Sequence, residues 1–159
     1  MFKFSRLIIT GAFVTFASVG SALQSSSAEN DGVVRVASAV PIEEAGKRVK
    51  QAIAEKGIQF FSEIDQAALA AKVGIKLRPS VLLVFGNPPL GTQFITANPN
   101  AGLDWPVRLL LTQDESGQVW AVYTDFDWIA RRHGISTRDE QFKMASGVVQ
   151  SITSAVAVK

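Results

Sequence analysis

Residues 86–92 read GNPPLGT and have the glycine spacing of a loop that cradles phosphate groups. Such a loop needs a lysine after its second glycine, but here Thr92 follows Gly91 directly. Pro88 and Pro89 also lack the backbone N–H groups that a phosphate cradle donates. The stretch therefore predicts a stiff corner at the end of a strand, and it argues against a nucleotide-binding site.

His133 is the single histidine of a chain that contains no cysteine. A structural zinc site draws on several Cys and His ligands, so we expect no metal and no cofactor. Nucleophilic catalysis by a serine triad would need a histidine and an activated serine, and no G-x-S-x-G elbow is present. His133 follows two arginines and precedes Gly134, which is typical of a residue that caps the C-terminus of a helix. We interpret it as such a cap.

The remaining chemistry lies in six polar residues at or near predicted strand ends: Asp65, Arg78, Asn87, Asp104, Arg108 and Tyr123. Arg78 or Arg108 can grip a carboxylate or a similar anion through paired hydrogen bonds. All except Asp65 are therefore candidate ligand-binding residues of a small polar pocket, and Asp65 is the candidate general base. The alternative is an Arg–Asp network that fixes strand ends, because buried charges need partners. The sequence favours this structural role.

The elements that must position these side chains follow from hydrophobic periodicity. Five apolar residues in series at 81–85, closed by turn residues, predict a central strand that is buried on both faces. Apolar residues three and four apart predict long helices over residues 41–56 and from 137 to about 156. Three tryptophans are predicted in the core or at a dimer interface: Trp105, Trp120 and Trp128.

Shorter elements complete the prediction. In residues 58–65, alternation places Ile58, Phe60 and Ile64 on one face of a strand. The other strands are predicted at 33–39, 107–112 and 118–124, and short helices at 66–73, 92–97 and 125–133. The last two strands form a hairpin. Strands that are consecutive late in the chain predict an α+β fold, a single compact domain with a mostly antiparallel sheet of about five strands and helices packed on one face.

Several motifs stand in a recognisable order: FSEID at 61–65, LRPSVLLVFGNPPLGT at 77–92, LDWPVR at 103–108, GQVW at 117–120 and ARRHGI at 130–135. In this order they resemble the family called domain of unknown function 302, over about residues 33–155. The resemblance implies a compact domain of the order strand, helix, four strands, helix, commonly found as a homodimer. It implies no established activity. Gln66 stands where the family commonly has a histidine, so this chain lacks any role of that histidine.

Residues 1–28 have the three parts of a secretory signal peptide. Lys3 and Arg6 precede an apolar run over residues 7–23, and small residues allow cleavage after Ala22 or after Ala28. The alternative is a retained membrane anchor, but the run is short and interrupted compared with the roughly 20 apolar residues that a bilayer requires. The sequence therefore predicts a periplasmic or secreted protein, with no stable membrane insertion after cleavage and one domain over residues 29–159.

The charge balance bears on the partners of the domain. The whole chain has 16 basic and 14 acidic residues, and Lys3 and Arg6 would leave with the signal peptide. The remainder then has no formal net charge, so we expect no nucleic-acid partner. The function favoured by the sequence is a non-catalytic, homodimeric domain that binds a small ligand, such as a small anion, or a protein. The alternative is an enzyme acting on a small anionic substrate with Asp65 as general base.

Overall fold

The computed structural model describes residues 31–158, and the predicted signal peptide lies outside them. The elements in chain order are β1 (Val33–Ala37), α1 (Ile42–Glu55), β2 (Gln59–Asp65), α2 (Gln66–Lys72), β3 (Ser80–Gly86), α3 (Pro88–Ala97), the 3₁₀ helix η1 (Pro99–Leu103), β4 (Val107–Gln113), β5 (Val119–Thr124), α4 (Phe126–Arg132) and α5 (Asp139–Thr153). All five predicted strands are present. Residues 98–102, whose composition is typical of a loop, belong largely to η1.

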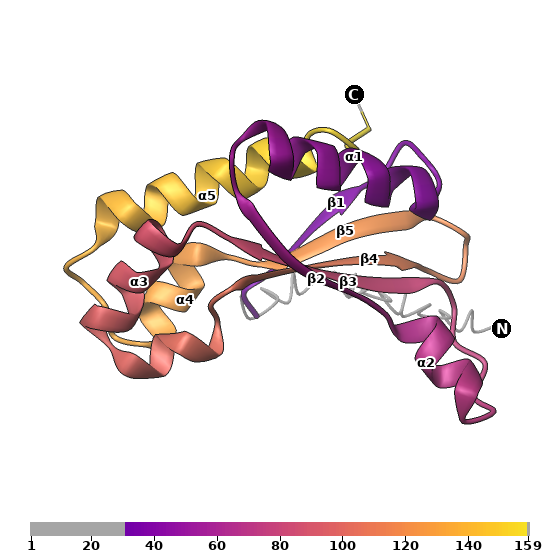
Figure 1. The fold of residues 1–159 in the computed structure, drawn as a ribbon, viewed down its shortest axis with the longest axis horizontal. Helices are drawn as coiled ribbons and strands as arrows, with labels where there is room; N and C mark the ends of the chain where they lie inside the picture. The colour runs from indigo at the N-terminus through magenta and orange to yellow at the C-terminus, as the bar shows by residue number, and fades with distance from the viewer. Residues whose placement is uncertain (1–30, 159) are drawn as a thin grey trace, which may run out of the picture.

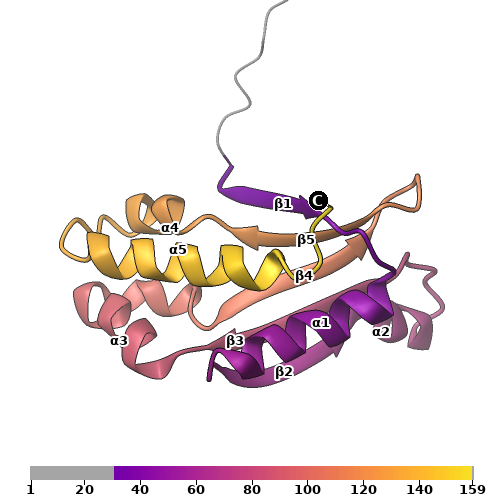
Figure 2. The same ribbon diagram turned by 90° about the horizontal axis from the view of Figure 1, so that it is seen from above.

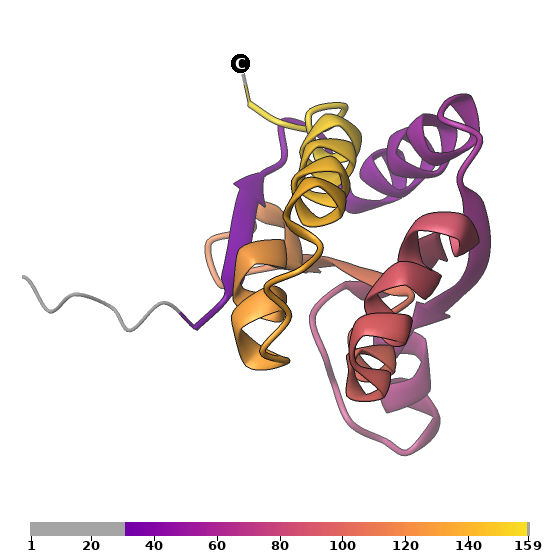
Figure 3. The same ribbon diagram turned by 90° about the vertical axis from the view of Figure 1, so that its left-hand side faces the viewer.

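The strands form one sheet in the order β1-β5-β4-β3-β2, with every neighbouring pair antiparallel. Helices α1 and α5 lie along one face of this sheet (Figures 1 and 2), and the view from the end shows both on the same side (Figure 3). The predicted α+β class is therefore confirmed. The prediction that residues 81–85 form the central strand is wrong, because β4 is central and β3 lies beside the edge strand β2.

The hydrophobic core lies between the sheet and the two long helices. Alternate residues of β4 and β5, such as Leu109, Leu111 and Ala121, are fully buried there. They pack with residues spaced three and four apart on the helices, among them Val49 of α1 and Val149 of α5. Each large apolar side chain buried in this way contributes roughly 1.5–3 kcal/mol. This layer fixes the position of α5 over the sheet.

The opposite face of the sheet, here called the open face, has no described helix across its middle (Figure 1). The pairing register aligns Ile64, Leu82, Leu110 and Val122 in one row across β2, β3, β4 and β5. Three of these side chains are partly buried and Ile64 is exposed. The prediction that residues 81–85 are buried on both faces is therefore wrong. All five residues are apolar, yet Leu82 and Val84, which alternate with the buried Leu83 and Phe85, lie on the open face.

Strand β2 departs from the predicted alternation. All seven of its residues are exposed, and the pairing register shifts after Phe60. The shift leaves Phe61 without a partner, as in a β-bulge, and the side-chain alternation restarts beyond it. Phe60 lies opposite Phe85 on the helix side, whereas Ile64 lies in the row of the open face. The prediction that these two residues share a face is wrong for this reason.

Candidate functional site

The predicted stiff corner forms the first turn of α3. Asn87 caps this helix: its backbone is extended (φ −109°, ψ 105°), and its Oδ1 accepts a hydrogen bond from the backbone N–H of Leu90 at 3.2 Å. Pro88 and Pro89 occupy the first helical positions, where a missing N–H breaks no helical hydrogen bond. The helix predicted from residue 92 therefore begins four residues earlier, at Pro88.

The two glycines of the corner accommodate Trp105. A Cβ atom on Gly86 would lie 2.6 Å from Cζ2 of the indole, and one on Gly91 would lie 1.8 Å from Cε2. Neither glycine has a positive φ, so close approach of the ring, and not backbone conformation, requires glycine at both positions. The ring of Phe94 meets the indole edge-on, with centroids 6.3 Å apart. The glycine spacing that suggested a phosphate loop serves to pack a tryptophan.

Asp104, directly before Trp105, is held by three cationic or potentially cationic side chains. Its Oδ2 lies 2.6 Å from Nε2 of His133 and 3.0 Å from Nη1 of Arg132, and its Oδ1 lies 3.2 Å from Nη2 of Arg108. The Asp104 and His133 side chains are only 4% and 5% exposed, whereas both arginines are about half exposed. This Asp104 cluster has the form of the structural network that a buried carboxylate requires.

The Asp104 cluster fixes the loop between η1 and β4 against the end of α4. His133 is the C-terminal cap residue of α4, where the sequence predicted it. Its carbonyl oxygen accepts a hydrogen bond from Nδ2 of Asn98 at 2.8 Å, so the loop is tied at two points. In the same helix, the guanidinium of Arg132 lies 5.3 Å from the ring centroid of Trp128. Trp105 therefore directly follows a residue that is held in place, Asp104, and its ring packs against the backbone of Gly86 and Gly91.

A cavity of about 280 Å³ opens beside Trp105, and we call it the corner cavity. Residues of β3, α3, β4, α4 and α5 contribute to its walls, together with Lys56 at the end of α1. Most of the lining is apolar and includes Phe85, Leu90, Trp105, Phe126, Ala145 and Val149. The polar side chains of the lining are those of Lys56 and Asn87. A mostly apolar hollow with a few polar groups is the usual form of a small-molecule site.

The six polar residues singled out from the sequence do not share one pocket. Asp65 and Arg78 lie at the end of the sheet where β3 begins. Asn87, Asp104 and Arg108 lie at the opposite end, where β3 stops and β4 starts. Of the six, Asn87 alone lines the corner cavity. The single polar pocket expected from the sequence is thus divided between the two ends of the sheet.

The other candidates are engaged elsewhere. Asp65 is exposed and caps α2, where its Oδ1 accepts a backbone hydrogen bond of 2.8 Å. Arg78 is half exposed and forms an ion pair with Glu115, whose side chain is 90% exposed. Tyr123 is 8% exposed, and burial together with the charge of Asp125 raises its pKa above the usual value of 10.0. An exposed cap does not supply the enclosed carboxylate that the enzymatic alternative needs.

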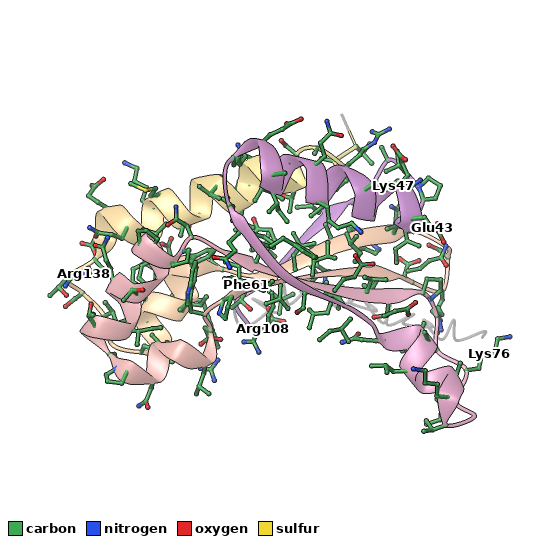
Figure 4. All side chains as sticks on the ribbon, in the orientation of Figure 1. Glu43, Lys47, Phe61, Lys76, Arg108 and Arg138 are labelled. Atoms are coloured by element: carbon green, nitrogen blue, oxygen red, sulfur yellow. The ribbon has the colours of Figure 1, made fainter. Side chains whose placement is uncertain are left out.

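Arg108 points to the side of the sheet away from α1 and α5 (Figure 4), so any anion held there would lie on the open face. Part of its guanidinium is already bonded to Asp104 and to the carbonyl oxygen of Leu103. Within residues 31–158, no group of three or more His, Asp and Glu side chains is placed to hold a metal ion. The corner cavity is therefore the candidate functional site.

Two residues of this site were not singled out from the sequence. Lys56 was predicted to end α1, and it is the C-terminal cap residue of that helix. Trp105 was predicted as a core or interface residue, and it forms a wall of the corner cavity. The two glycines were a usable signal, because a glycine in a strand often marks a place where another group approaches the backbone closely. The sequence around the two glycines does not show which aromatic ring packs against them.

Similarity to known proteins identifies the family of this chain. Residues 34–156 match the family described as "Domain of unknown function DUF302". The chain belongs to this family. The resemblance inferred from the motifs is thereby confirmed. The crystal structure of an uncharacterized conserved DUF302 protein from Bacillus stearothermophilus is similar with a TM-score of 0.72 and 13% identity, covering 79% of this chain and 98% of that one. At this identity, the likeness shows that the fold is shared.

Two curated relatives are named "Fluoride-specific ion channel FluC 1", from Brucella suis biovar 1 (strain 1330) and Brucella abortus biovar 1 (strain 9-941). Each is 36% identical to this DUF302 chain over 106 residues, which is 67% of this chain. The match covers 42% and 39% of those proteins, so the chain spans about two fifths of their length. Between residues 31 and 158, none of the helices has the length and apolar character needed to cross a membrane.

Proposed function

We propose that this DUF302 domain is an exported, non-catalytic binding protein that holds a small ligand in the corner cavity. The cavity itself is the observation that carries the proposal. This hollow opens to the surface, has about 280 Å³ and is bounded by the fixed Trp105 ring. A preformed hollow with a rigid aromatic wall suits binding.

Binding is better supported than turnover by the groups that line the corner cavity. Lys56 is its one charged side chain, and Asn87 is its other polar one. General acid–base catalysis needs a titratable group within reach of the reacting atoms. Asp65, the candidate base, lies at the other end of β3. The lining thus offers contacts and one charge, but no acid–base pair.

Filling the corner cavity tests this function. Ala145 of α5 is 4% exposed and lines the cavity, so Ala145→Leu adds three carbon atoms inside it. Gln150→Leu, on an exposed position of the same helix, is the matched control. In a thermal-shift screen of small organic molecules, a compound at 100 times its Kd adds about 2.7 kcal/mol to the stability of the folded state. We expect hits with the wild type and the control, and their loss in Ala145→Leu.

Two outcomes of that screen would contradict the binding function. One is that no compound stabilises the wild type. The other is that compounds stabilise Ala145→Leu as much as the wild type, since the ligand would then lie elsewhere. A melting curve of each variant without compounds separates lost binding from lost folding, because added carbon in a packed site costs typically 1–3 kcal/mol.

We further propose that two copies pair through the open face and α2. Helix α2 has seven residues, none of them buried, and a helix this short is not stable alone in water. Five of the large apolar side chains that are exposed belong to α2 or lie close to it in the chain: Ile64, Leu69, Val73, Ile75 and Leu77. Exposed apolar surface of this kind supports a protein–protein contact, and a second copy would cover both α2 and the apolar row.

Light scattering during size-exclusion chromatography tests the homodimer. We expect the wild type to have twice the mass of one chain. Leu110→Lys places a charge in the middle of the open face and should yield a monomer. Gln51→Lys adds the same charge to an exposed position of α1, which lies on the other side of the sheet, and should leave the dimer intact. If the wild type has the mass of one chain, the proposed homodimer is wrong.

Export rests on the charged start and the apolar run of residues 1–28. Fractionation of cells that produce the chain with a C-terminal tag, followed by mass spectrometry of the N-terminus, tests it. We expect a protein outside the cytoplasm that begins at Leu23 or Glu29. An intact N-terminus at Met1 in the membrane fraction would support the retained anchor instead.

The channel relatives favour a second candidate function, an accessory domain that acts beside a fluoride channel. In those proteins, a segment 36% identical to this chain belongs to the same polypeptide as the channel. Deletion of the gene in its natural host should then lower growth in fluoride and leave growth in chloride unchanged. Restoration by the wild type but not by Ala145→Leu would link this role to the corner cavity. Unchanged fluoride tolerance after deletion removes the candidate.

A further inference from the structure

We propose that the ligand of the corner cavity is a small monocarboxylate with an apolar body, preferably aromatic. This inference rests on the proposed binding function and adds the chemical class of the ligand. Three features of the cavity carry it: the hydrogen-bonding character of its polar groups, its charge, and its size together with its aromatic walls.

The first feature is the hydrogen-bonding character of Asn87, an exposed residue that lines the cavity. Its side-chain oxygen accepts the hydrogen bond from Leu90 and is thereby engaged in the cap of α3. Its Nδ2 forms no hydrogen bond with the residues of the described chain, so the amide N–H groups are what remains for a ligand. Lys56 offers only donors as well, because an ammonium group has no acceptor. A ligand that satisfies both must present acceptor oxygens.

The second feature is the sign of the charge. Lys56 is the one charged residue of the lining, and no acidic side chain accompanies it there. Within residues 31–158 it forms no ion pair, in contrast to Lys50, whose Nζ lies 2.7 Å from Glu63. An anionic head would therefore be compensated at the cavity, and an ammonium head would be repelled. A carboxylate also forms stronger, charge-assisted hydrogen bonds with an ammonium group than a neutral amide does.

The third feature is size and wall chemistry. About 280 Å³ corresponds to on the order of ten non-hydrogen atoms, if each takes roughly the 30 Å³ of a water molecule. Phe85, Trp105 and Phe126 provide aromatic walls, and Ala145 and Val149 provide aliphatic ones. Aromatic rings prefer offset or edge-on neighbours of the same kind. A single ring or a short branched chain fills a volume of this size.

Three probes of nearly equal size test the ligand class: phenylacetate, its neutral amide phenylacetamide, and the cation phenethylamine. Isothermal titration gives each Kd, and the measurement is repeated with Ala145→Leu to show that the probe binds in the corner cavity. We expect phenylacetate to bind the wild type about tenfold more tightly than the amide, as a charge-assisted bond predicts. Lys56→Gln should remove that difference. Lys72→Gln, which removes the same charge from exposed α2, should keep it.

The outcomes separate the ligand class from the binding function. If the amide or the amine binds as tightly as phenylacetate, and Ala145→Leu abolishes that binding, the monocarboxylate class is overturned and the binding site stands. If Lys56→Gln leaves the preference for phenylacetate unchanged, the assigned role of Lys56 is overturned. If none of the three probes binds the wild type, the ligand class is overturned, and the wider thermal-shift screen decides separately on the binding function.

Discussion

Replacing Asp104 with asparagine removes the charge at the centre of the Asp104 cluster and keeps the shape of the side chain. The carboxylate is 4% exposed and within 3.2 Å of donors on Arg108, Arg132 and His133. Breaking a buried ion pair costs about 3–5 kcal/mol, because the partner remains buried without compensation. Here both arginines are about half exposed and can turn to water, so the cost is smaller. We expect a loss of about 2 kcal/mol.

Glu63→Gln is the matched control for this substitution. Glu63 Oε2 lies 2.7 Å from Nζ of Lys50, at least as close as the arginine contacts of Asp104, but both side chains are more than 40% exposed. An exposed pair of this kind contributes about 0–1 kcal/mol. The Glu63 contact is no longer than the arginine contacts of Asp104, so the greater burial of Asp104 and its larger number of partners predict the larger loss.

Equilibrium unfolding in urea, followed by tryptophan fluorescence, measures both losses. For a domain of this size, a loss of about 2 kcal/mol lowers the Tm by roughly 6–10 °C. Asp104→Asn should also weaken binding of any ligand that the corner cavity takes, because Trp105 follows the substituted residue directly. The reasoning is refuted if Asp104→Asn destabilises the protein no more than Glu63→Gln does.

Three further predictions concern a glycine and two titrating groups. Gly91→Ala places a Cβ 1.8 Å from the indole packed against it and should cost about 1–3 kcal/mol, whereas Gly147→Ala, in open space on α5, should stabilise the protein by up to about 1 kcal/mol; equal urea midpoints would contradict this. Hydrogen bonds from the serine hydroxyl two residues later and from the Trp120 indole lower the pKa of Asp114 from 3.8 to about 2. Its contribution to stability is therefore present above about pH 4 and lost as the pH falls towards 2. The indole N–H resonance of Trp120 should shift with a midpoint near pH 2, and a midpoint near 4 would contradict the assignment. Tyr123 is the single tyrosine, so alkaline absorbance reports it alone, and its midpoint should lie above 10.0; a midpoint at or below that value would show that the ring is not buried.

Local sequence patterns predicted most of the fold. Helix α1 illustrates this: Val49 and Ile53 repeat at helical spacing and Gly57 ends the element, and all of that information lies within one segment. The hairpin of β4 and β5 was equally local. The order of strands in the sheet is a property of pairing between segments, so the sequence of residues 81–85 could not distinguish a central strand from its neighbour.

Two predictions were wrong for physical reasons that hydrophobic periodicity does not reveal. The apolar run of β3 predicted burial on both faces, yet its outer side chains, such as Leu82, lie on the open face. A run of apolar residues shows that both faces of a strand are apolar, but it does not show which other elements pack on each face. The bulge at Phe61 removed the alternation of β2, and such a one-residue insertion has no distinct composition.

The candidate site was predicted least well, because contacts between distant residues create it. Asp104 and Arg108 were expected to form a network, but their partner His133 lies 29 residues from Asp104. The corner cavity brings Lys56 and Asn87 together with residues of α5. Only Asn87 among these had been singled out, for its place at the end of a predicted strand. Residues far apart in the sequence form this site, so local patterns do not predict it. The glycine pair beside Trp105 was the one local signal, and it belongs to one wall.

The two sides of the corner cavity differ in how freely they can change. The Trp105 side is tied to glycine backbone and to the Asp104 cluster, so a substitution there disturbs several elements at once. The α5 side includes Met144, which is 59% exposed, and Val148, one helical turn later. Met144 is exposed and Val148 is only partly buried against the core, so apolar exchanges at these two positions disturb the packing less than changes on the Trp105 side. A library that varies only these two positions could therefore select new ligands on an unaltered scaffold.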